Sequence, residues 1–116
     1  MSVIVQVEAF LDNFKVKMNV WDVLFFSDRQ KNTQTLATLE IWPNDVKIIL
    51  TELSVQDYSE GPLPDKMLGG AEMWVFGRVV KGHEIYIKIT LGRPNNPVIC
   101  ISFHVAEYPM TYPLRV

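Results

Sequence analysis

The stretch that decides the fold of this chain is MWVFGRVVKGHEIYIKITLGRPNNPVICISFH, residues 73–104. It holds three apolar runs separated by two segments of turn-forming residues. A period of two is what a strand with one buried face requires, because successive side chains point to opposite faces of the sheet. The alternation therefore predicts a three-stranded antiparallel meander. Its expected inward-facing residues include Ile85, Ile87, Ile89 and Leu91 in the middle run and Ile99, Ile101 and Phe103 in the last run.

The turn between the first two strands decides which side chains share a face. A three-residue loop over residues 80–82, with Gly82 supplying the positive φ of a bulge, places Arg78 opposite Glu84. A two-residue Lys81-Gly82 loop would shift the register and send Arg78 into the core, and Lys-Gly is a poor pair for a type I′ turn. We therefore expect the three-residue loop. The exposed face then collects Arg78, Glu84, Tyr86, Lys88, Ser102 and His104, flanked by Trp74 and Phe76.

The rest of the chain adds helices and one further strand. Apolar residues at helical spacing predict an N-terminal helix, although valines at 3, 5 and 7 also fit a short strand. Proline suits the first turn of a helix, where its missing N–H costs nothing. The expected elements are a helix over residues 2–18, a strand over 20–26, a loop over 27–32, a short helix over 33–39, a helix from Pro43, a long irregular loop over 55–70 and an extended tail over 108–113.

This order of elements indicates a single α+β domain, residues 1–116, with helices packed on one face of a small antiparallel sheet. The pattern leaves open whether residues 20–26 pair with the first or the last strand of the meander. Cys100 is the one cysteine, so no disulfide framework is expected, and a reducing cytoplasm fits. We expect Cys100 to be a small buried or half-buried residue.

Charge and hydropathy exclude several classes of protein. No run is long enough for a transmembrane helix, and the N-terminus lacks a basic region followed by an apolar stretch, so no membrane association is expected. The net charge of −2 counts against a large nucleic-acid footprint, because phosphate contacts require many cations. A small basic patch remains compatible with this balance. The two histidines are not at ligand spacing, so neither a metal nor another cofactor is expected.

The exposed face of the meander carries the candidate chemistry. Tyr86 and Lys88 emerge together from one strand, with His104 on the neighbouring strand and Arg78 on the other side. Metal-free RNA cleavage needs a base for the ribose 2′-OH, a cation for the phosphate and an acid for the leaving oxygen. His104 is the best proton-transfer candidate, since its ordinary pKa lies near neutrality. Lys88 or Arg78 would stabilise the phosphate, and the aromatic rings of Trp74 or Phe76 would stack on a base.

Each of these residues also has a purely structural interpretation. Tyrosine and lysine on the outer face of a strand are most often ordinary surface. Arg78 and Glu84 are most simply a cross-strand ion pair. Trp74 and Phe76 would then be covered by the N-terminal helix or by the tail. The face alone is therefore weak support for catalysis.

A family resemblance favours the catalytic interpretation. The segments that carry it are Leu53–Ser59, Met73-Trp74, Gly82, Ile85–Ile89 and Val98–His104. In order and spacing they resemble the C-terminal half of MqsR-type toxins, over roughly residues 33–104. The resemblance implies a RelE-like fold, mRNA interferase activity and a DNA-binding antitoxin as partner.

The resemblance is incomplete at the catalytic positions. Tyr86 and Lys88 match the family's Tyr-x-Lys strand, in which the tyrosine is catalytic. Glu60 stands where the family has a catalytic lysine, Val75 where it has a glutamine, and His104 where it has a second lysine. Histidine is a chemically reasonable substitute for lysine at a proton-transfer or phosphate position, whereas valine is no substitute for glutamine. We therefore expect either a site rearranged around His104 and Glu60 or a loss of activity, and we favour the rearrangement.

Two functional hypotheses follow. The first is a cytoplasmic toxin of a type II toxin–antitoxin pair that cleaves mRNA, free or ribosome-bound, without a metal. Its expected catalytic residues are His104, Tyr86, Lys88 and Glu60, its expected substrate-binding residues are Arg78, Trp74 and Phe76, and its expected partner is an antitoxin with a helix-turn-helix DNA-binding domain. The second is a non-catalytic protein-interaction module that binds a protein partner through Trp74, Phe76 and the Tyr/Pro tail.

Overall fold

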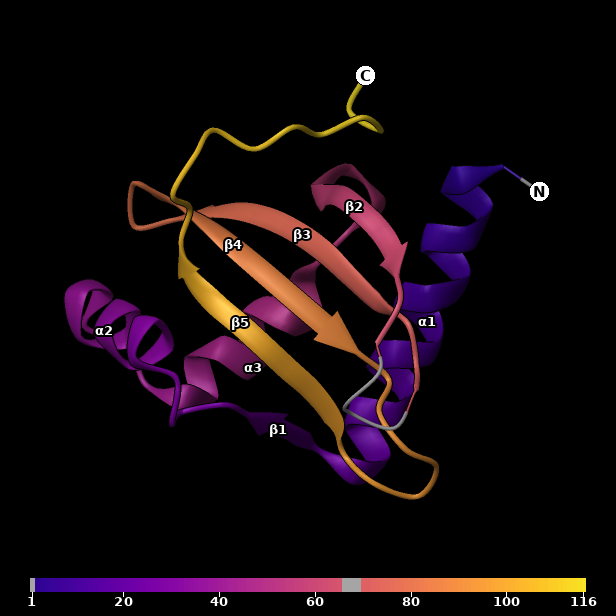
Figure 1. The fold of residues 1–116 in the computed structure, drawn as a ribbon, viewed down its shortest axis with the longest axis horizontal. Coiled ribbons are helices and arrows are strands. Elements are labelled where there is room, and N and C mark those ends of the chain that lie inside the picture. The colour runs from indigo at the N-terminus through magenta and orange to yellow at the C-terminus, as the bar shows by residue number, and fades with distance from the viewer. Residues whose placement is uncertain (1, 66–69) are drawn as a thin grey trace.

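In the computed structural model, which describes residues 2–65 and 70–116, the chain is an α+β domain built on one sheet. Its strands lie in the order β1-β5-β4-β3-β2, and β3, β4 and β5 form the expected antiparallel meander (Figure 1). The elements are α1 (Val3–Trp21), β1 (Val23–Phe25), α2 (Gln30–Leu39), α3 (Pro43–Glu52), the 3-10 turn η1 (Val55–Asp57), β2 (Tyr58–Leu63), β3 (Met73–Val80), β4 (His83–Thr90) and β5 (Val98–Val105).

The first strand makes the sheet mixed rather than wholly antiparallel. β1 pairs with β5 in parallel, with Val23 opposite Val98, so it joins the last strand of the meander. The strand expected over residues 20–26 is shorter, because α1 continues to Trp21. The Ser2 hydroxyl accepts from the amide of Val5 and caps α1, which confirms a helix at the N-terminus.

Helices α1 and α3 cover one face of the sheet and leave the other open (Figure 1). The Phe10 ring of α1 stacks on Trp74 at 5.0 Å between ring centroids, and Leu50 of α3 is fully buried in the same core. We call this side the helix face and the opposite side the open face. The helices contribute Val7, Phe10, Leu11, Phe14, Met18, Val46 and Leu50 to the core.

The β3–β4 hairpin has the two-residue turn, so the expectation of a three-residue loop is wrong. Val80 pairs with His83, and the intervening Lys81 and Gly82 have φ of 49° and 83°, the two positive values of a type I′ turn. The Lys81 ammonium donates to the carbonyl of Leu39 at 2.9 Å, a tertiary contact that stabilises a turn that lysine seldom enters. The side chains of β3 therefore lie on the faces opposite to those expected.

A β-bulge in β5 changes which of its residues face the helices. Lys88 pairs with Ser102 and Ile89 pairs with Cys100, so Ile101 is an additional residue between the two pairs. Cys100 is buried in the core on the helix face, as expected for a small residue. Ile99 and Ile101 are buried, as expected, but they lie outside this core on the helix face. The members of the core on β5 are Val98, Cys100 and Phe103.

The segment expected to be a long loop over residues 55–70 holds η1 and the edge strand β2. Tyr58 faces the core, 6.3 Å from Phe76 between ring centroids, and its hydroxyl donates to the carbonyl of Gly61. β2 has register shifts on both sides of Glu60 and includes Pro62, which only an edge strand tolerates. Residues 66–69 of the expected loop lie outside the described chain.

Side chains of helix α2, rather than a further strand, form hydrogen bonds with the outer edge of β5. The buried Asn32 amide donates to the carbonyl of Ile101 at 3.0 Å, and its oxygen accepts from the amide of Phe103 at 3.0 Å. The Thr35 hydroxyl accepts from the amide of Val105 at 3.2 Å. These contacts satisfy backbone groups of β5 beyond the end of β1. α2 starts at Gln30, three residues before the expected helix, so the expected loop is shorter.

The C-terminal tail leaves β5 and turns back toward β3 and β2, in yellow at the top of Figure 1, and its residues 106–111 lie beside the open face. Glu84 of β4 holds it at two points: one carboxylate oxygen accepts from the amide of Met110 at 3.1 Å and the other from the hydroxyl of Tyr112 at 2.7 Å. The Arg115 guanidinium lies 3.7 Å from the Tyr112 ring centroid and donates to the carbonyl of Gln56. The extended tail is thus confirmed, and it forms a wall beside the open strands.

Candidate functional site

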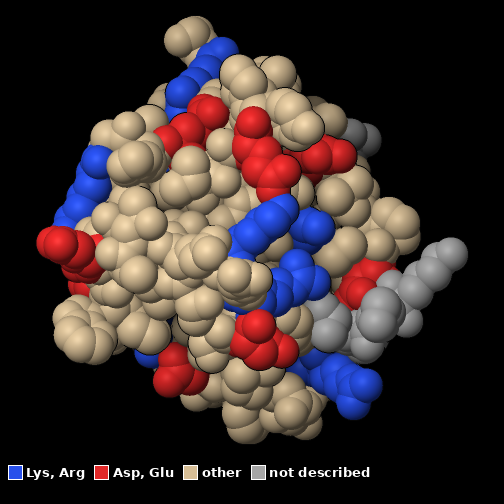
Figure 2. All heavy atoms as spheres, turned by 60° about the vertical axis from the view of Figure 1, so that its left-hand side comes forward, with Lys and Arg blue, Asp and Glu red and all other residues tan. Residues whose placement is uncertain are grey.

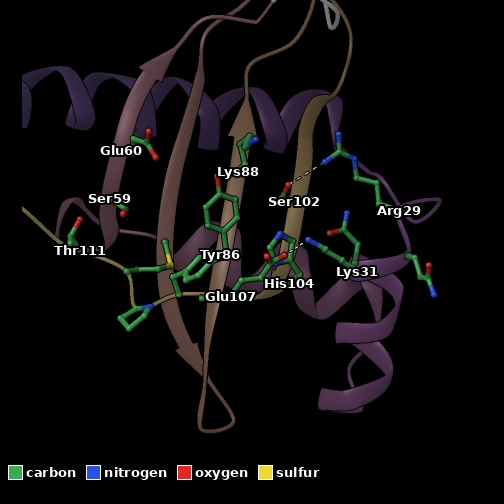
Figure 3. Close-up of a pocket in the computed structure, with 16 residues that line it drawn as sticks. Arg29, Lys31, Ser59, Glu60, Tyr86, Lys88, Ser102, His104, Glu107 and Thr111 are labelled. Atoms are coloured by element: carbon green, nitrogen blue, oxygen red, sulfur yellow. Dashed lines mark hydrogen bonds and ion pairs between the residues drawn. The ribbon is translucent and has the colours of Figure 1, made fainter.

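The open face holds a cavity of about 810 Å³ between the sheet, the start of α2 and the tail (Figure 3). We call it the open-face pocket. Side chains from five parts of the chain converge there, because the sheet register sets β4 beside β5 and the Asn32 contacts fix α2 along the edge of β5. Its lining residues are Arg29, Gln30, Lys31 and Asn32 at α2, Ser59 and Glu60 on β2, Tyr86 and Lys88 on β4, Ser102 and His104 on β5, and residues 106–111 of the tail.

Tyr86 and His104 form the centre of the pocket. They are direct partners in the β4–β5 register, and their rings stack with centroids 5.1 Å apart and planes 13° apart. The Nδ1 of His104 lies 3.0 Å from the carbonyl oxygen of Val105. A carbonyl oxygen only accepts, so this contact assigns the proton to Nδ1 and leaves the lone pair on Nε2 in the neutral ring. The imidazole is therefore oriented to exchange a proton through Nε2.

The Tyr86 phenol is held in its protonated form. Burial raises the pKa of Tyr86 above its ordinary value of 10.0, and the negative charge of Glu60 raises it further. At neutral pH the hydroxyl is therefore a hydrogen-bond donor rather than a base. In Figure 3 the phenol points along the strand toward Lys88, whose ammonium lies 5.9 Å from the ring centroid.

A second row of polar residues lies beside this pair. Lys88 is directly opposite Ser102 in the register, and the Arg29 guanidinium donates to the Ser102 hydroxyl at 3.5 Å from the far side. Lys31 is close to the Tyr86–His104 pair, where its ammonium forms an ion pair with Glu107 of the tail. That ion pair lowers the pKa of Glu107, and the charge of His104 adds to the effect.

The cations that line the pocket outnumber its two carboxylates, Glu60 and Glu107, although the whole chain has a net charge of −2. Three of its cations are Arg29, Lys31 and Lys88. On the side of the molecule drawn in Figure 2, Lys and Arg side chains gather together with Asp and Glu around them. A local cluster of this kind can hold an anion without making the protein basic as a whole.

The four residues expected to be catalytic, Glu60, Tyr86, Lys88 and His104, all line the open-face pocket. Glu60 pairs with Val75 in the β2–β3 register, and Val75 pairs with Lys88, so the carboxylate is two strands away from the ammonium. Val75 also belongs to the open face and is buried there. No glutamine occupies that position, and polar groups enter the pocket from α2 instead.

The three residues expected to bind substrate do not reach the pocket. Trp74 and Phe76 lie in the core on the helix face, with 6% and 0% of their surfaces exposed. Arg78 is paired with Ile85, and its guanidinium contacts Glu52 of α3 at 3.5 Å. These three side chains lie on the helix face because the two-residue hairpin turn shifts the register of β3 and so exchanges its two faces. The expected roles of these residues are wrong, and so is their use as an exposed protein-binding surface.

Sequence reasoning missed Arg29, Lys31 and the tail. Arg29 and Lys31 lie in a polar segment that was expected to be a loop, and only the docking of α2 on β5 directs them into the pocket. The tail was expected to be extended, but its path across the open face depends on Glu84. A pair of cations at spacing i, i+2 in a polar segment is the one local signal for such a contribution.

Comparisons with known proteins add nothing to this geometry. Searches against protein-family models, curated proteins and solved structures find no match. Within residues 2–65 and 70–116, no group of three or more His, Cys, Asp and Glu side chains is placed to hold a metal ion. None of the described helices is long and apolar enough to cross a membrane.

Proposed function

We propose that this chain is the toxin of a type II toxin–antitoxin pair, an endoribonuclease that cleaves mRNA in the cytoplasm without a metal ion. The observation that carries the proposal is the stacked pair of Tyr86 and His104 in a basic, open pocket. An imidazole, which can act as a base or an acid, then lies beside a protonated phenol and an ammonium group. These are the groups that transesterification of RNA requires.

His104 moves the proton in this mechanism. Its Nε2 accepts the proton of the ribose 2′-OH and then donates it to the leaving 5′ oxygen, while the Val105 carbonyl keeps the ring oriented through Nδ1. The 2′ oxygen attacks the adjacent phosphorus, the bond from phosphorus to the 5′ oxygen breaks, and a 2′,3′-cyclic phosphate forms. Glu60, on the opposite wall of the pocket, assists from there with its negative charge, which adds to burial in raising the pKa of Tyr86.

Tyr86 and Lys88 position and stabilise the phosphate. The phenol donates a hydrogen bond to a non-bridging oxygen, and the ammonium offsets the negative charge that develops on the phosphorane. Lys88 is half-buried, whereas Arg29 and Lys31 are exposed, so a contact of Lys88 with the phosphate is the one that solvent weakens least. This arrangement has a histidine, His104, where the MqsR-type pattern has its second lysine.

The resemblance of residues 33–104 to MqsR-type toxins supports the toxin assignment and implies a helix-turn-helix antitoxin. An antitoxin that covers the open-face pocket would inhibit cleavage in the simplest way. A gene for a small helix-turn-helix protein beside the gene for this chain would support the pairing. Growth arrest on expression of the chain, relieved by that neighbour, is the expected result in cells.

The direct test is cleavage of a labelled mRNA fragment by the purified protein in the presence of EDTA. We expect cleavage of free or ribosome-bound message, products that end in a 2′,3′-cyclic phosphate, and resistance of a substrate with a 2′-deoxyribose at the cleaved position. A protein that leaves both forms of the message intact at equimolar concentration is not this enzyme. Cleavage of the deoxy substrate would exclude the attack by the 2′ oxygen.

A further inference from the structure

We propose that Arg29 and Ser102, beside Lys88, form a phosphate-binding subsite that is separate from the Tyr86–His104 pair. It binds the phosphate that neighbours the cleaved one on the same RNA strand. This inference rests on the proposed function for the identity of the ligand, an RNA phosphate, but the anion site itself follows from the geometry.

The subsite is a straight row across two strands and the start of a helix. Lys88 and Ser102 are register partners, and Arg29 reaches Ser102 from the other side (Figure 3). The row lies two residues along the strands from the pair Tyr86 and His104. Two residues of a strand span about 6.6–6.8 Å. That distance is too long for Arg29 and the Tyr86–His104 pair to hold one phosphate, and it is comparable with the separation of neighbouring phosphates in a single strand. Lys88, whose ammonium lies 5.9 Å from the Tyr86 ring, stands between the two phosphates.

The cations of this row have no protein anion to neutralise them. Neither Arg29 nor Lys88 contacts a carboxylate within residues 2–65 and 70–116. Every other described Lys and Arg side chain except Arg93 contacts a carboxylate or a backbone carbonyl, as Lys31 does with Glu107. Two uncompensated cations that line one cavity are a favourable place for an external anion.

The third member of the row completes the set of hydrogen-bond donors. Ser102 is only 3% exposed, and its hydroxyl oxygen accepts from Arg29, which leaves the hydroxyl proton for a ligand. The planar guanidinium of Arg29 presents two further donors in the geometry that matches a phosphate, and it also lies 6.0 Å from the Phe26 ring. Lys88 adds a point charge from the other side of the same hydroxyl.

A binding role for Arg29 differs from a catalytic role in kinetics. The Arg29→Gln variant should raise the KM for a longer RNA on the order of tenfold and leave kcat nearly unchanged, because it removes a contact that is present before and during the reaction. The extra phosphate of a trinucleotide, compared with a dinucleotide, should lower KM for the wild-type protein and not for this variant. Arg29→Lys, which keeps the charge, should restore part of the difference.

The experiment that tests the subsite is a titration of the ¹⁵N-labelled protein with inorganic phosphate, followed by the amide shifts of residues 29 and 102. We expect saturable shifts in the wild-type protein and in His104→Ala, and their loss in Arg29→Gln. Arg93→Gln is the matched control, since Arg93 is the other unpaired arginine and lies outside the pocket. It should bind phosphate as the wild-type protein does.

The outcomes separate this inference from the proposed function. Phosphate binding that Arg29→Gln abolishes supports the subsite, even if no RNA is cleaved, and in that case the nuclease proposal alone falls. RNA cleavage with an unchanged KM in Arg29→Gln overturns the subsite and leaves the nuclease proposal standing. Equal phosphate binding by Arg29→Gln and the wild-type protein also overturns it.

Discussion

Gly77 of β3 lies directly beneath the Tyr112 hydroxyl of the tail, with no room for a side chain between them. A Cβ at position 77 would lie 2.8 Å from the sulfur of Met110 and closer still to the Tyr112 oxygen. Gly77 is also the register partner of Tyr86, on the open face. The tail thus rests on the sheet beside the candidate catalytic pair because this residue is glycine.

Gly77→Ala should therefore displace the tail. The added methyl group overlaps the hydroxyl of Tyr112 and the sulfur of Met110, which are the ends of flexible side chains that can move, so the cost should lie at the lower end of about 1–3 kcal/mol. Urea denaturation should show that loss, and limited proteolysis should cut the tail sooner than in the wild-type protein. The same substitution in a Tyr112→Ala background should cost less, because part of the overlap is gone. Equal costs in both backgrounds would show that the tail does not contact Gly77.

Tyr112 should make the stability of the protein fall at high pH. Burial, followed by its hydrogen bond to Glu84, raises the pKa of Tyr112 from 10.0 to about 12. The folded state therefore holds the phenolic proton more tightly than the unfolded state. The stabilisation is complete below pH 10 and is lost as the pH rises through 12. Denaturation measured at a series of pH values in this window tests the expectation.

The control for that experiment is Tyr112→Phe. Burial raises the pKa of Cys100 from 9.0 to about 12, so this thiol also makes the stability fall at high pH. The contribution of Tyr112 is therefore the difference between the pH dependence of the wild-type protein and that of the variant. The variant should be less stable than the wild-type protein at neutral pH, and the gap should close above pH 10. A gap that stays constant would mean that the pKa of Tyr112 is not raised in the folded protein.

Asn32→Ala should be among the most damaging substitutions in α2. The Asn32 amide bridges the backbone of Ile101 and Phe103, and it also donates to Phe26 at 2.9 Å. Each buried backbone group left without a partner costs about 1–3 kcal/mol. Urea denaturation should show a total loss on the order of 3 kcal/mol. Thr33→Ala, an exposed change one residue further along the helix, should leave the free energy of unfolding within about 0.5 kcal/mol.

Arg78→Met should leave RNA cleavage unchanged, since its side chain lies on the helix face. KM and kcat should stay within about twofold of the wild-type values, whereas Lys88→Met on the open face should lower kcat/KM at least about tenfold. Stability should change by less than about 1 kcal/mol, because Glu52, the partner of Arg78, is half exposed. A large loss of activity in Arg78→Met would place β3 in the register that the sequence first suggested.

Most of the helices and strands could be predicted from local patterns in the sequence. The alternation in residues 83–90 fixes the faces of β4, so Tyr86 and Lys88 were placed correctly. Proline at position 43 and the cap at Ser2 marked two helix starts. Such signals depend on neighbours in sequence, and for that reason they can be seen without a structure.

The wrong predictions concern features that depend on a contact from a distant part of the chain. The type I′ turn at Lys81 is supported by the carbonyl of Leu39, which the local sequence does not reveal. The bulge at Ile101 is held by Asn32 from α2. In the candidate site, the same docking brings in Arg29, so its place in the pocket could not be predicted from the periodicity of the strands.

The measurement that tests the central claim most directly compares the two histidines of the chain. His104 stacks on Tyr86 in the pocket, whereas His83 lies exposed at the β3–β4 turn. In single-turnover cleavage of one RNA in EDTA, His104→Ala should be slower by about 10²-fold or more, the usual contribution of general acid–base catalysis. His83→Ala should match the wild-type rate within about twofold. Equal rates for His104→Ala and the wild-type protein would contradict the proposed role of the Tyr86–His104 pair.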